Sequence, residues 1–290
     1  MNSDLLFEYF DIVNHVLREN NTNDLVDFYN KSNNKCRFNI LNELTRINNL
    51  ELFKTIFLLM QETLTQQNYI SLLKLASHFR SYFIVEYLLQ NGATANFPDG
   101  YNPHLDNCFI EPKSLYNTVK ILVENGAKIS NQDIINITKT PDLDMDTIKL
   151  FVEYGANIHT FGELPLKNIS MYSNNSDSVE VLKYFIDHGA NIHIDNGIVL
   201  QNYIHRTKYD CIKLLLDNEA STKNISCNDL SMLVKEGNYE IIKLLVDHGL
   251  DLTNIYNYLT ISDSQNKIVD ILLEYGMDPK TLVLLCINKN

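Results

Sequence analysis

Residues 242–253 read IKLLVDHGLDLT, and variants of this phrase occur seven times between Val85 and Lys280. The other copies are VEYLLQNGATAN (85–96), VKILVENGAKIS (119–130), IKLFVEYGANIH (148–159), LKYFIDHGANIH (182–193), IKLLLDNEASTK (212–223) and VDILLEYGMDPK (269–280). Self-similarity at a nearly fixed period is the sequence signature of a stacked repeat protein. The phrase therefore predicts the fold class, and it favours a binding function over catalysis.

Each copy predicts an α-helix that ends at a glycine. Counted back from the glycine, positions −7, −4 and −3 are apolar in every copy, as at Ile242, Leu245 and Val246. This spacing marks one face of a helix. Glycine then ends the helix, because it enters the left-handed conformation without a steric penalty. Glu219 stands in the glycine position of the fifth copy, so we expect that helix to end less cleanly.

A row of charges marks a second face of these helices. Lysine stands at position −6 and an acid at position −2 in five copies, a spacing of i, i+4. Such pairs contribute at most about 0.2–0.5 kcal/mol each. We interpret the row as a solvated outer face rather than a binding stripe. The pairs are Lys120/Glu124, Lys149/Glu153, Lys183/Asp187, Lys213/Asp217 and Lys243/Asp247.

The composition limits the partners that we expect. Asp and Glu number 36 against 24 Lys and Arg, giving a net charge of −12, which argues against a reader of nucleic-acid phosphates. The sequence has no apolar run of 18 residues and begins without a basic segment, so we expect neither a membrane span nor a signal peptide. Five scattered cysteines are typical of reduced thiols in an intracellular protein. We expect a monomer in the cytoplasm.

The sequence shows no convincing chemistry for an enzyme, a metal or a cofactor. His159 and His193 recur because the repeat recurs, and they lack zinc-site spacing. His104 and Cys108 are an i, i+4 pair without an identifiable third group for nucleophilic catalysis. The acids of PDLDMD (141–146) lack the glycine and glutamate of a calcium loop, and we expect Asp146 to cap the next helix. We therefore predict a protein without enzymatic activity, metal or cofactor.

Residues 233–252, LVKEGNYEIIKLLVDHGLDL, resemble the second half of an ankyrin repeat. The resemblance extends from about residue 67 to the C-terminus and reappears in degraded form at NLELFKTIF (49–57). Asn and Ile are used heavily and Lys outnumbers Arg. This composition resembles that of ankyrin proteins in large DNA viruses of amoebae. The matching residues are Gly237, Asn238, Glu240, Ile241, Ile242, Leu244, Leu245, Gly249 and Asp251.

The resemblance implies an all-α solenoid of antiparallel helix pairs separated by finger-like turns. The concave surface of fingers and inner helices of this family binds other proteins, and catalysis is not among its activities. The family's Thr-Pro-Leu-His motif is absent, since residues 228–231 read NDLS in that slot. We therefore expect the usual Thr–His hydrogen bonding to be missing and the solenoid to be irregular.

The resemblance predicts two regions. Residues 67–290 form about seven repeat units, the last one truncated. Residues 1–66 form a helical N-terminal region, which is interpreted either as degenerate repeats that cap the stack or as a separate docking module. The second interpretation allows a substrate adaptor that delivers a bound target to a ubiquitin ligase or another modifying enzyme.

The predicted function is that of a protein-interaction scaffold, with a partner of unknown identity held by the fingers. Residues of the finger turns differ between copies, as residues that recognise one target must. Phe161 and Tyr101 are the best anchor candidates, because aromatic side chains dominate interface hot spots. The candidate contact residues are Asp99, Tyr101, Gln132, Phe161, Glu163, Asp195 and Tyr256.

Overall fold

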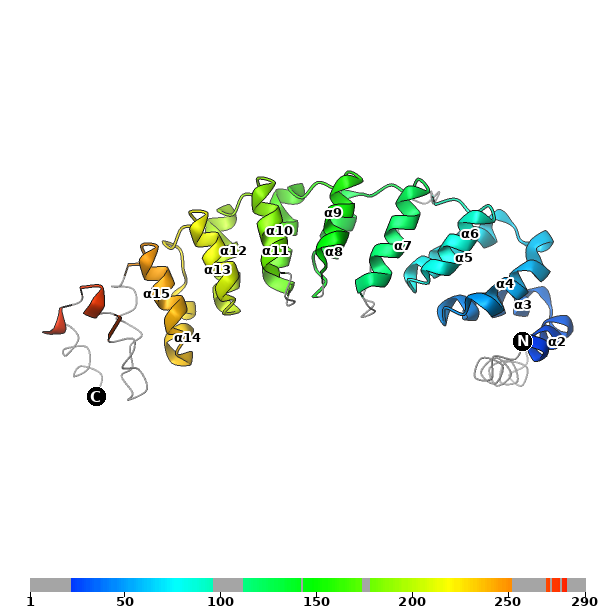
Figure 1. Ribbon diagram of the computed structural model, residues 1–290, viewed down its shortest axis with the longest axis horizontal. Helices are drawn as coiled ribbons and strands as arrows, with labels where there is room; N and C mark the ends of the chain where they lie inside the picture. Colours follow the sequence, from blue (N-terminus) through cyan, green and yellow to red (C-terminus); the bar gives the residue numbers. More distant parts are fainter. Residues whose placement is uncertain are drawn as a thin grey trace. The chain divides into compact units, whose positions relative to one another are not determined.

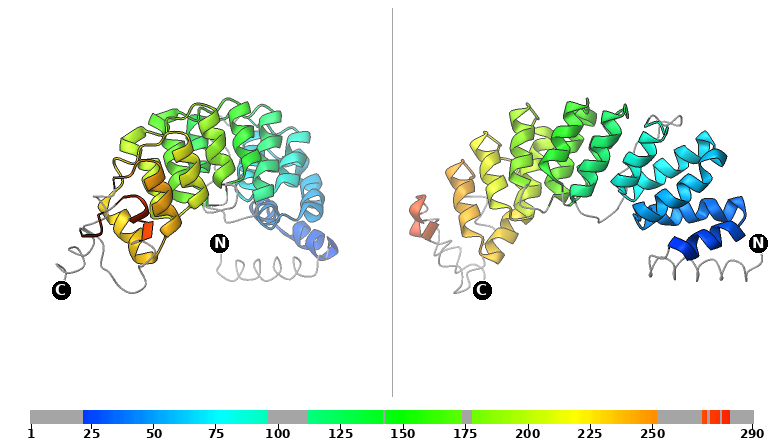
Figure 2. Two further views of the ribbon diagram at one scale, coloured as in Figure 1. Left: turned by 60° about the vertical axis from the view of Figure 1, so that its left-hand side comes forward. Right: turned by 45° about the vertical axis from the view of Figure 1, so that its right-hand side comes forward.

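The computed structural model describes residues 22–95, 112–141, 143–173, 178–251, 270–271, 273–276 and 278–280. Within these ranges the chain forms helices and turns and no strand, which confirms the predicted all-α class. Consecutive helices pack as neighbouring pairs (Figures 1 and 2). Besides the short 3-10 helix η1 (Gln61–Thr63), the helices are α2 (Thr22–Lys31), α3 (Asn34–Arg46), α4 (Leu50–Met60), α5 (Gln66–His78), α6 (Tyr82–Gln90), α7 (Pro112–Glu124), α8 (Asn131–Ile137), α9 (Met145–Glu153), α10 (Thr160–Tyr172), α11 (Ser178–Asp187), α12 (Ile194–His205), α13 (Tyr209–Asp217), α14 (Cys227–Glu236) and α15 (Tyr239–Asp247).

The chain divides into two compact units, residues 1–136 with 149–156 and residues 137–148 with 157–290. We call the helix that carries the repeated phrase the outer helix of its pair, and the helix before it the inner helix. In the second unit, inner helices α10, α12 and α14 pack on one another in order, and outer helices α11, α13 and α15 do the same. In the first unit α3 packs on α5 and α4 on α6 in the same manner. Each helix therefore contacts its partner and the corresponding helices of adjacent pairs, as in a repeat protein.

The apolar stripe of the repeated phrase forms the core of the stack. Positions −7 and −4 are buried in every described copy, as at Ile212, Leu215, Ile242 and Leu245, all 0% exposed. Position −3 is more variable and is half-buried at Val246. Since a single helix pair cannot bury this stripe alone, the apolar burial that stabilises each pair comes from its neighbours.

The row of charges lies on the surface, as expected. The acids at position −2 are exposed in all five copies, and the lysines at position −6 are exposed in four. Two ion pairs of the second unit run between repeats: Lys243 Nζ lies 3.4 Å from Glu274 Oε1, and His248 Nε2 lies 3.6 Å from Asp217 Oδ1. Exposed pairs of this kind contribute about 0–1 kcal/mol, so the row is a solvated face with a minor part in stability.

A left-handed residue ends each outer helix. Gly92, Gly155, Gly189 and Gly249 have φ angles between 81° and 99°. After Gly189, the amide of Ala190 donates to the carbonyl of Phe185 at 3.0 Å, which is the long bond of a Schellman motif. This turn satisfies carbonyl groups that the end of the helix would otherwise leave unpaired.

Glu219 adopts the same turn without being a glycine. Its φ is 67°, and the amide of Ala220 donates to the carbonyl of Leu215 at 3.0 Å, as in the glycine copies. The expectation of a less clean helix end was therefore wrong. Packing of the neighbouring repeats holds the backbone in this turn. Glu219 is therefore kept in a left-handed conformation that is sterically unfavourable for a residue with a Cβ.

We predict that Glu219→Gly stabilises the protein by about 0.5–1 kcal/mol, because glycine removes the steric cost of the left-handed conformation and loses only part of this gain to backbone entropy. Gly189→Ala is the matched opposite, since a Cβ there would meet no atom within 4 Å and the φ of 81° alone opposes it. The urea concentration at the unfolding midpoint should be highest for Glu219→Gly, intermediate for the wild type and lowest for Gly189→Ala. Equal midpoints would contradict the prediction.

The start of α9 corrects one expectation. Asp144, not Asp146, caps this helix: its carboxylate accepts from the Thr147 amide at 2.8 Å and from the Thr147 hydroxyl at 2.6 Å. An N-cap side chain accepts from the amide three residues later. Because α9 begins at Met145, that amide belongs to Thr147 and the cap is Asp144.

Tyr203 places a polar group in the core of the second unit. Its side chain is fully buried, and no described residue supplies its hydroxyl with a hydrogen-bond partner of ordinary geometry. Burial, with the Cys211 thiol nearby, raises the pKa of Tyr203 well above its usual value of 10. Burial also raises the pKa of Cys211, whose Sγ lies 3.8 Å from the Ser178 hydroxyl.

We predict that Tyr203→Phe stabilises the protein by about 1 kcal/mol at pH 7, because it removes a buried hydroxyl that is not hydrogen-bonded. The pH dependence should change as well. The folded chain keeps the Tyr203 proton that the unfolded chain loses above pH 10, so wild-type stability falls as the pH rises past 10. Unfolding measured between pH 7 and 11 should show a shallower alkaline decline in the variant. A lower stability at pH 7 would refute the prediction.

Candidate protein-interaction surface

Two finger turns of the second unit share one construction. The Asn157 side chain accepts from the His159 amide at 2.9 Å, and the Asn191 side chain accepts from the His193 amide at 3.0 Å. Both turns are therefore closed by an asparagine two residues before a histidine, which is an Asx-turn. The two histidines occupy equivalent places at the base of successive fingers, as expected.

Each of these fingers then passes through three consecutive left-handed residues. Their φ angles are 50°, 62° and 58° at Phe161, Gly162 and Glu163, and 47°, 59° and 81° at Asp195, Asn196 and Gly197. Asp, Asn and Gly tolerate this conformation, whereas Phe and Glu do not. A residue held in such a conformation costs about 1–3 kcal/mol, and such residues cluster where proteins contact ligands. The finger that carries Phe161 is thus the strained one of the two.

Glu163, a predicted contact residue, lies inside this finger. The residue is 8% exposed, and its Oε1 lies 2.9 Å from Nδ1 of His159. Its Oε2 is buried and has no hydrogen-bond partner among the described residues. The side chain therefore serves the internal structure of the finger and does not offer a surface for a partner.

We predict that Glu163→Gly is more stable than Glu163→Ala by about 1 kcal/mol. Both substitutions remove the carboxylate and its contact with His159, so their difference isolates the cost of a Cβ at a φ of 58°. The next finger already has a glycine, Gly197, at this position. Denaturant unfolding of the two variants measures the difference, and an alanine variant as stable as the glycine variant would show that the finger is not strained.

Phe161 is the most exposed large hydrophobic side chain in the described part of the chain, at 71%. A Cβ at the adjacent Gly162 would lie 4.0 Å from Cδ1 of Ile194, so the next finger packs beside this turn. Asp195 occupies the place of Phe161 in that next finger, and its Oδ2 lies 3.0 Å from Nζ of Lys167 on α10. The structure therefore places Phe161 and Asp195 on adjacent fingers, with Lys167 beside them.

One face of α10 continues this exposed surface. Leu164 and Lys167 are half-buried and Met171 is 50% exposed, and their spacing of three and four residues places them on one side of the helix. Leu166 and Ile169 on the opposite side are 0% exposed. We call Phe161, Leu164, Lys167 and Met171 the α10 surface. Sequence analysis missed Leu164, Lys167 and Met171, although their position on the inner helix opposite the buried stripe could have indicated them.

Side-chain hydrogen bonds between inner helices stand in for the Thr-Pro-Leu-His motif, which the sequence lacks. Nδ2 of Asn168 donates to Oγ1 of Thr138 at 3.2 Å, and Nδ2 of Asn202, 34 residues later, donates to Oγ of Ser170 at 2.8 Å. Arg206 also donates to the carbonyl oxygen of Ser170 at 2.9 Å. These bonds hold the inner helices, and with them the α10 surface, in fixed register.

The other candidate residues are less informative. Gln132 is exposed in the first turn of α8, and its Nε2 donates to Oδ1 of Asn136 at 2.9 Å. Asp99, Tyr101 and Tyr256 lie outside the described residues. Within the part of the chain that the structure describes, no three His, Cys, Asp or Glu side chains form a group that could hold a metal ion, and no helix is long and apolar enough to span a membrane.

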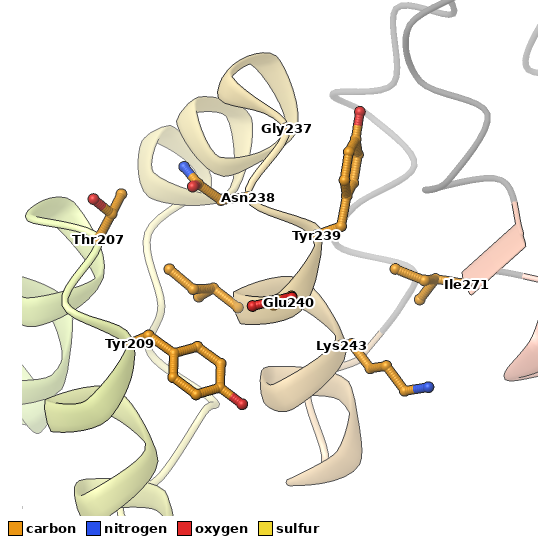
Figure 3. Close-up of a pocket in the computed structure, with 9 residues that line it drawn as sticks. Thr207, Tyr209, Gly237, Asn238, Tyr239, Glu240, Lys243 and Ile271 are labelled. Atoms are coloured by element: carbon orange, nitrogen blue, oxygen red, sulfur yellow. The ribbon is translucent and has the colours of Figure 1, made fainter.

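A hollow of about 540 Å³ lies at the turns that lead from inner to outer helices in the second unit. Tyr209 and Tyr239, the first residues of α13 and α15, lie on either side of Glu240 in the view of Figure 3. Both tyrosines stand ten residues before the glycine position of the repeated phrase, a coincidence visible in the sequence but not recognised from it. The lining residues are Thr207, Tyr209, Gly237, Asn238, Tyr239, Glu240, Ile241, Lys243 and Ile271.

The chain is similar to several proteins of one virus. An ankyrin repeat protein of Acanthamoeba polyphaga mimivirus is 25% identical over 266 residues, covering 86% of this chain and 70% of the relative. A second ankyrin repeat protein of that virus is 33% identical over 98 residues, covering 31% of this chain and 32% of the relative. A third ankyrin repeat protein of that virus is 24% identical over 220 residues, covering 69% of this chain and 67% of the relative. No family model matches the chain.

Helix pairs that share a buried stripe, each closed by a left-handed turn, define an α-helical repeat protein. Together with these relatives, this architecture supports a divergent ankyrin repeat protein of the mimivirus type. Ankyrin repeat proteins are generally non-enzymatic, and the similarity implies a scaffold for protein–protein interaction.

Proposed function

We propose that the chain binds a partner protein through the finger and inner-helix surface of its second unit, with Phe161 as the anchor. The observation that carries the proposal is that Phe161 is 71% exposed while its backbone is held at a φ of 50°. An exposed aromatic ring on a strained backbone contributes nothing to the core, and both features are typical of residues kept for contact with a ligand.

The construction of the finger favours Phe161 as an anchor. The Asx-turn at Asn157, the buried Glu163 and the contact with Ile194 hold the turn in place before a partner arrives. A turn whose backbone is already fixed loses little conformational entropy on binding, so more of the contact energy appears as affinity. Phe161 therefore meets the requirement for a hot spot better than an aromatic residue at the end of a free loop.

The surroundings of Phe161 resemble those of a protein interface. Leu164 and Met171 extend the apolar contact along α10, and the ion pair of Lys167 with Asp195 provides a polar rim beside it. A buried apolar centre with polar surroundings is the common anatomy of such interfaces. Asp195 thus acts through its pair with Lys167, and the partner contacts both side chains together.

We further propose that the protein acts as a monomer in the cytoplasm, which is the host cytoplasm if the chain is viral, as its relatives suggest. The net charge of −12 favours a protein partner over a nucleic acid. The division into residues 1–66 and 67–290, and the adaptor alternative, stay predictions.

The test is affinity capture from the natural host cell with full-length protein, followed by measurement of the captured partner's affinity. We expect Phe161→Ala to weaken binding at least about tenfold, because loss of an aromatic hot spot costs about 2 kcal/mol or more. Tyr154→Ala, which alters a 39% exposed aromatic at the end of α9, is the control and should bind as wild type. Circular dichroism checks folding. An unchanged affinity of the Phe161 variant would refute the proposed surface.

A further inference from the structure

We propose that the hollow between Tyr209 and Tyr239 is a second binding site, which takes an arginine side chain from a basic segment of a protein. This site lies at the turns from inner to outer helices, whereas Phe161 lies at a turn from an outer to an inner helix. Successive helices of a pair run in opposite directions, so these two kinds of turn lie at opposite ends of the helices (Figure 1). None of the four residues of the α10 surface lines the hollow, so the two sites are distinct.

The size and lining of the hollow fit a side chain of a protein partner. Its volume of about 540 Å³ lies within the range of ligand sites, about 300–1,000 Å³. Polar groups such as Thr207, Asn238 and Glu240 lie beside the apolar Ile241 and the two tyrosines. A mixed lining of this kind suits a long side chain with an apolar stem and a polar head better than a wholly apolar ligand.

The charges around the hollow favour a cation. Exposed carboxylates belong to Glu240 in the lining, to Asp210 next to Tyr209, and to Asp270 next to Ile271. The lysine of the lining, Lys243, is engaged by Glu274 at 3.4 Å. Lys208 beside Tyr209 and Arg206 beside Thr207 are also cations next to the lining in the chain, and Arg206 binds the carbonyl oxygen of Ser170 on α10. The three exposed carboxylates outnumber the lysines around the site.

Arginine fits these groups better than lysine does. A guanidinium group stacks on tyrosine faces and binds a carboxylate with two parallel hydrogen bonds, and an ammonium group does not offer this planar geometry. Tyr209 and Tyr239 bring aromatic rings to the lining from two successive repeats, with the ring of Tyr239 over Gly237, and Glu240 supplies the carboxylate (Figure 3). The acidic balance of the whole chain would also attract a basic segment before contact.

The chain contains a matched position that lacks the tyrosine. Val179 and Glu180 on α11 stand where Tyr239 and Glu240 stand on α15, ten and nine residues before the glycine of the phrase. Glu180 is exposed, as Glu240 is. Glu180→Gln therefore removes the same charge from an equivalent helix position outside the hollow.

The experiment is a fluorescence-polarisation titration of full-length protein into a labelled GRGRGRG peptide at 0.15 M salt. Peptides with Lys or Glu in place of Arg are compared. We expect the Arg peptide to bind at least about threefold more tightly than the Lys peptide, and the Glu peptide not to bind. Glu240→Gln should weaken the Arg peptide about tenfold and Tyr209→Leu about fivefold, while Tyr209→Phe, which keeps the ring, should bind as wild type.

Two controls separate the site from its alternatives. Glu180→Gln should bind the Arg peptide as wild type, and so should Phe161→Ala, since the hollow does not depend on the α10 surface. The proposal is overturned if Glu180→Gln weakens binding as much as Glu240→Gln, which would indicate diffuse attraction to an acidic surface. It is also overturned if the wild-type protein does not distinguish Arg from Lys, or binds neither peptide at millimolar concentration.

Discussion

Every described copy of the repeated phrase depends on one backbone residue that takes a positive φ at the end of its outer helix. The turn directs the chain toward the next finger and pairs the last carbonyl groups of the helix, as at Gly189 and Ala190. The buried stripe can pack on its neighbours only if each helix stops at this place. Glu219 shows how strong the constraint is, because the turn persists there without glycine and at a steric cost.

The repeated phrase sufficed to predict helices, their glycine ends and the buried stripe, because these depend on spacing within one helix. Contacts between repeats were not predictable in this way. Nothing in the sequence near Asn168 indicates Thr138 as its acceptor, since that bond depends on how two inner helices are aligned. Glu163 was predicted to contact a partner because it lies in a variable finger turn, whereas the structure buries it beside three left-handed residues. Phe161, predicted as an anchor, is 71% exposed, and its contact with a partner stays a prediction.

The second unit presents different chemistry at its two kinds of turn. The fingers offer an ordered aromatic ring with apolar residues behind it, and the turns from inner to outer helices offer tyrosine faces with carboxylates. Both surfaces are made by residues at repeat positions that do not belong to the buried apolar stripe. A repeat scaffold can therefore vary its two edges independently, because neither set of side chains takes part in the packing that holds the helices together.

The hydrogen bonds between inner helices also limit how such a protein can change in length. Asn202 needs a hydroxyl group on the helix before it, and Ser170 supplies one, while Arg206 needs the carbonyl group of that same serine. Loss of the repeat that carries α10 and α11 would bring Asn202 to the place of Asn168, where the hydroxyl group of Thr138 is available. A repeat whose inner helix offers no hydroxyl group at this point would leave the amide of Asn202 without its partner. Exchange of repeats should therefore be tolerated only where the preceding inner helix offers such a group, so that the array has a rule of order despite its similar parts.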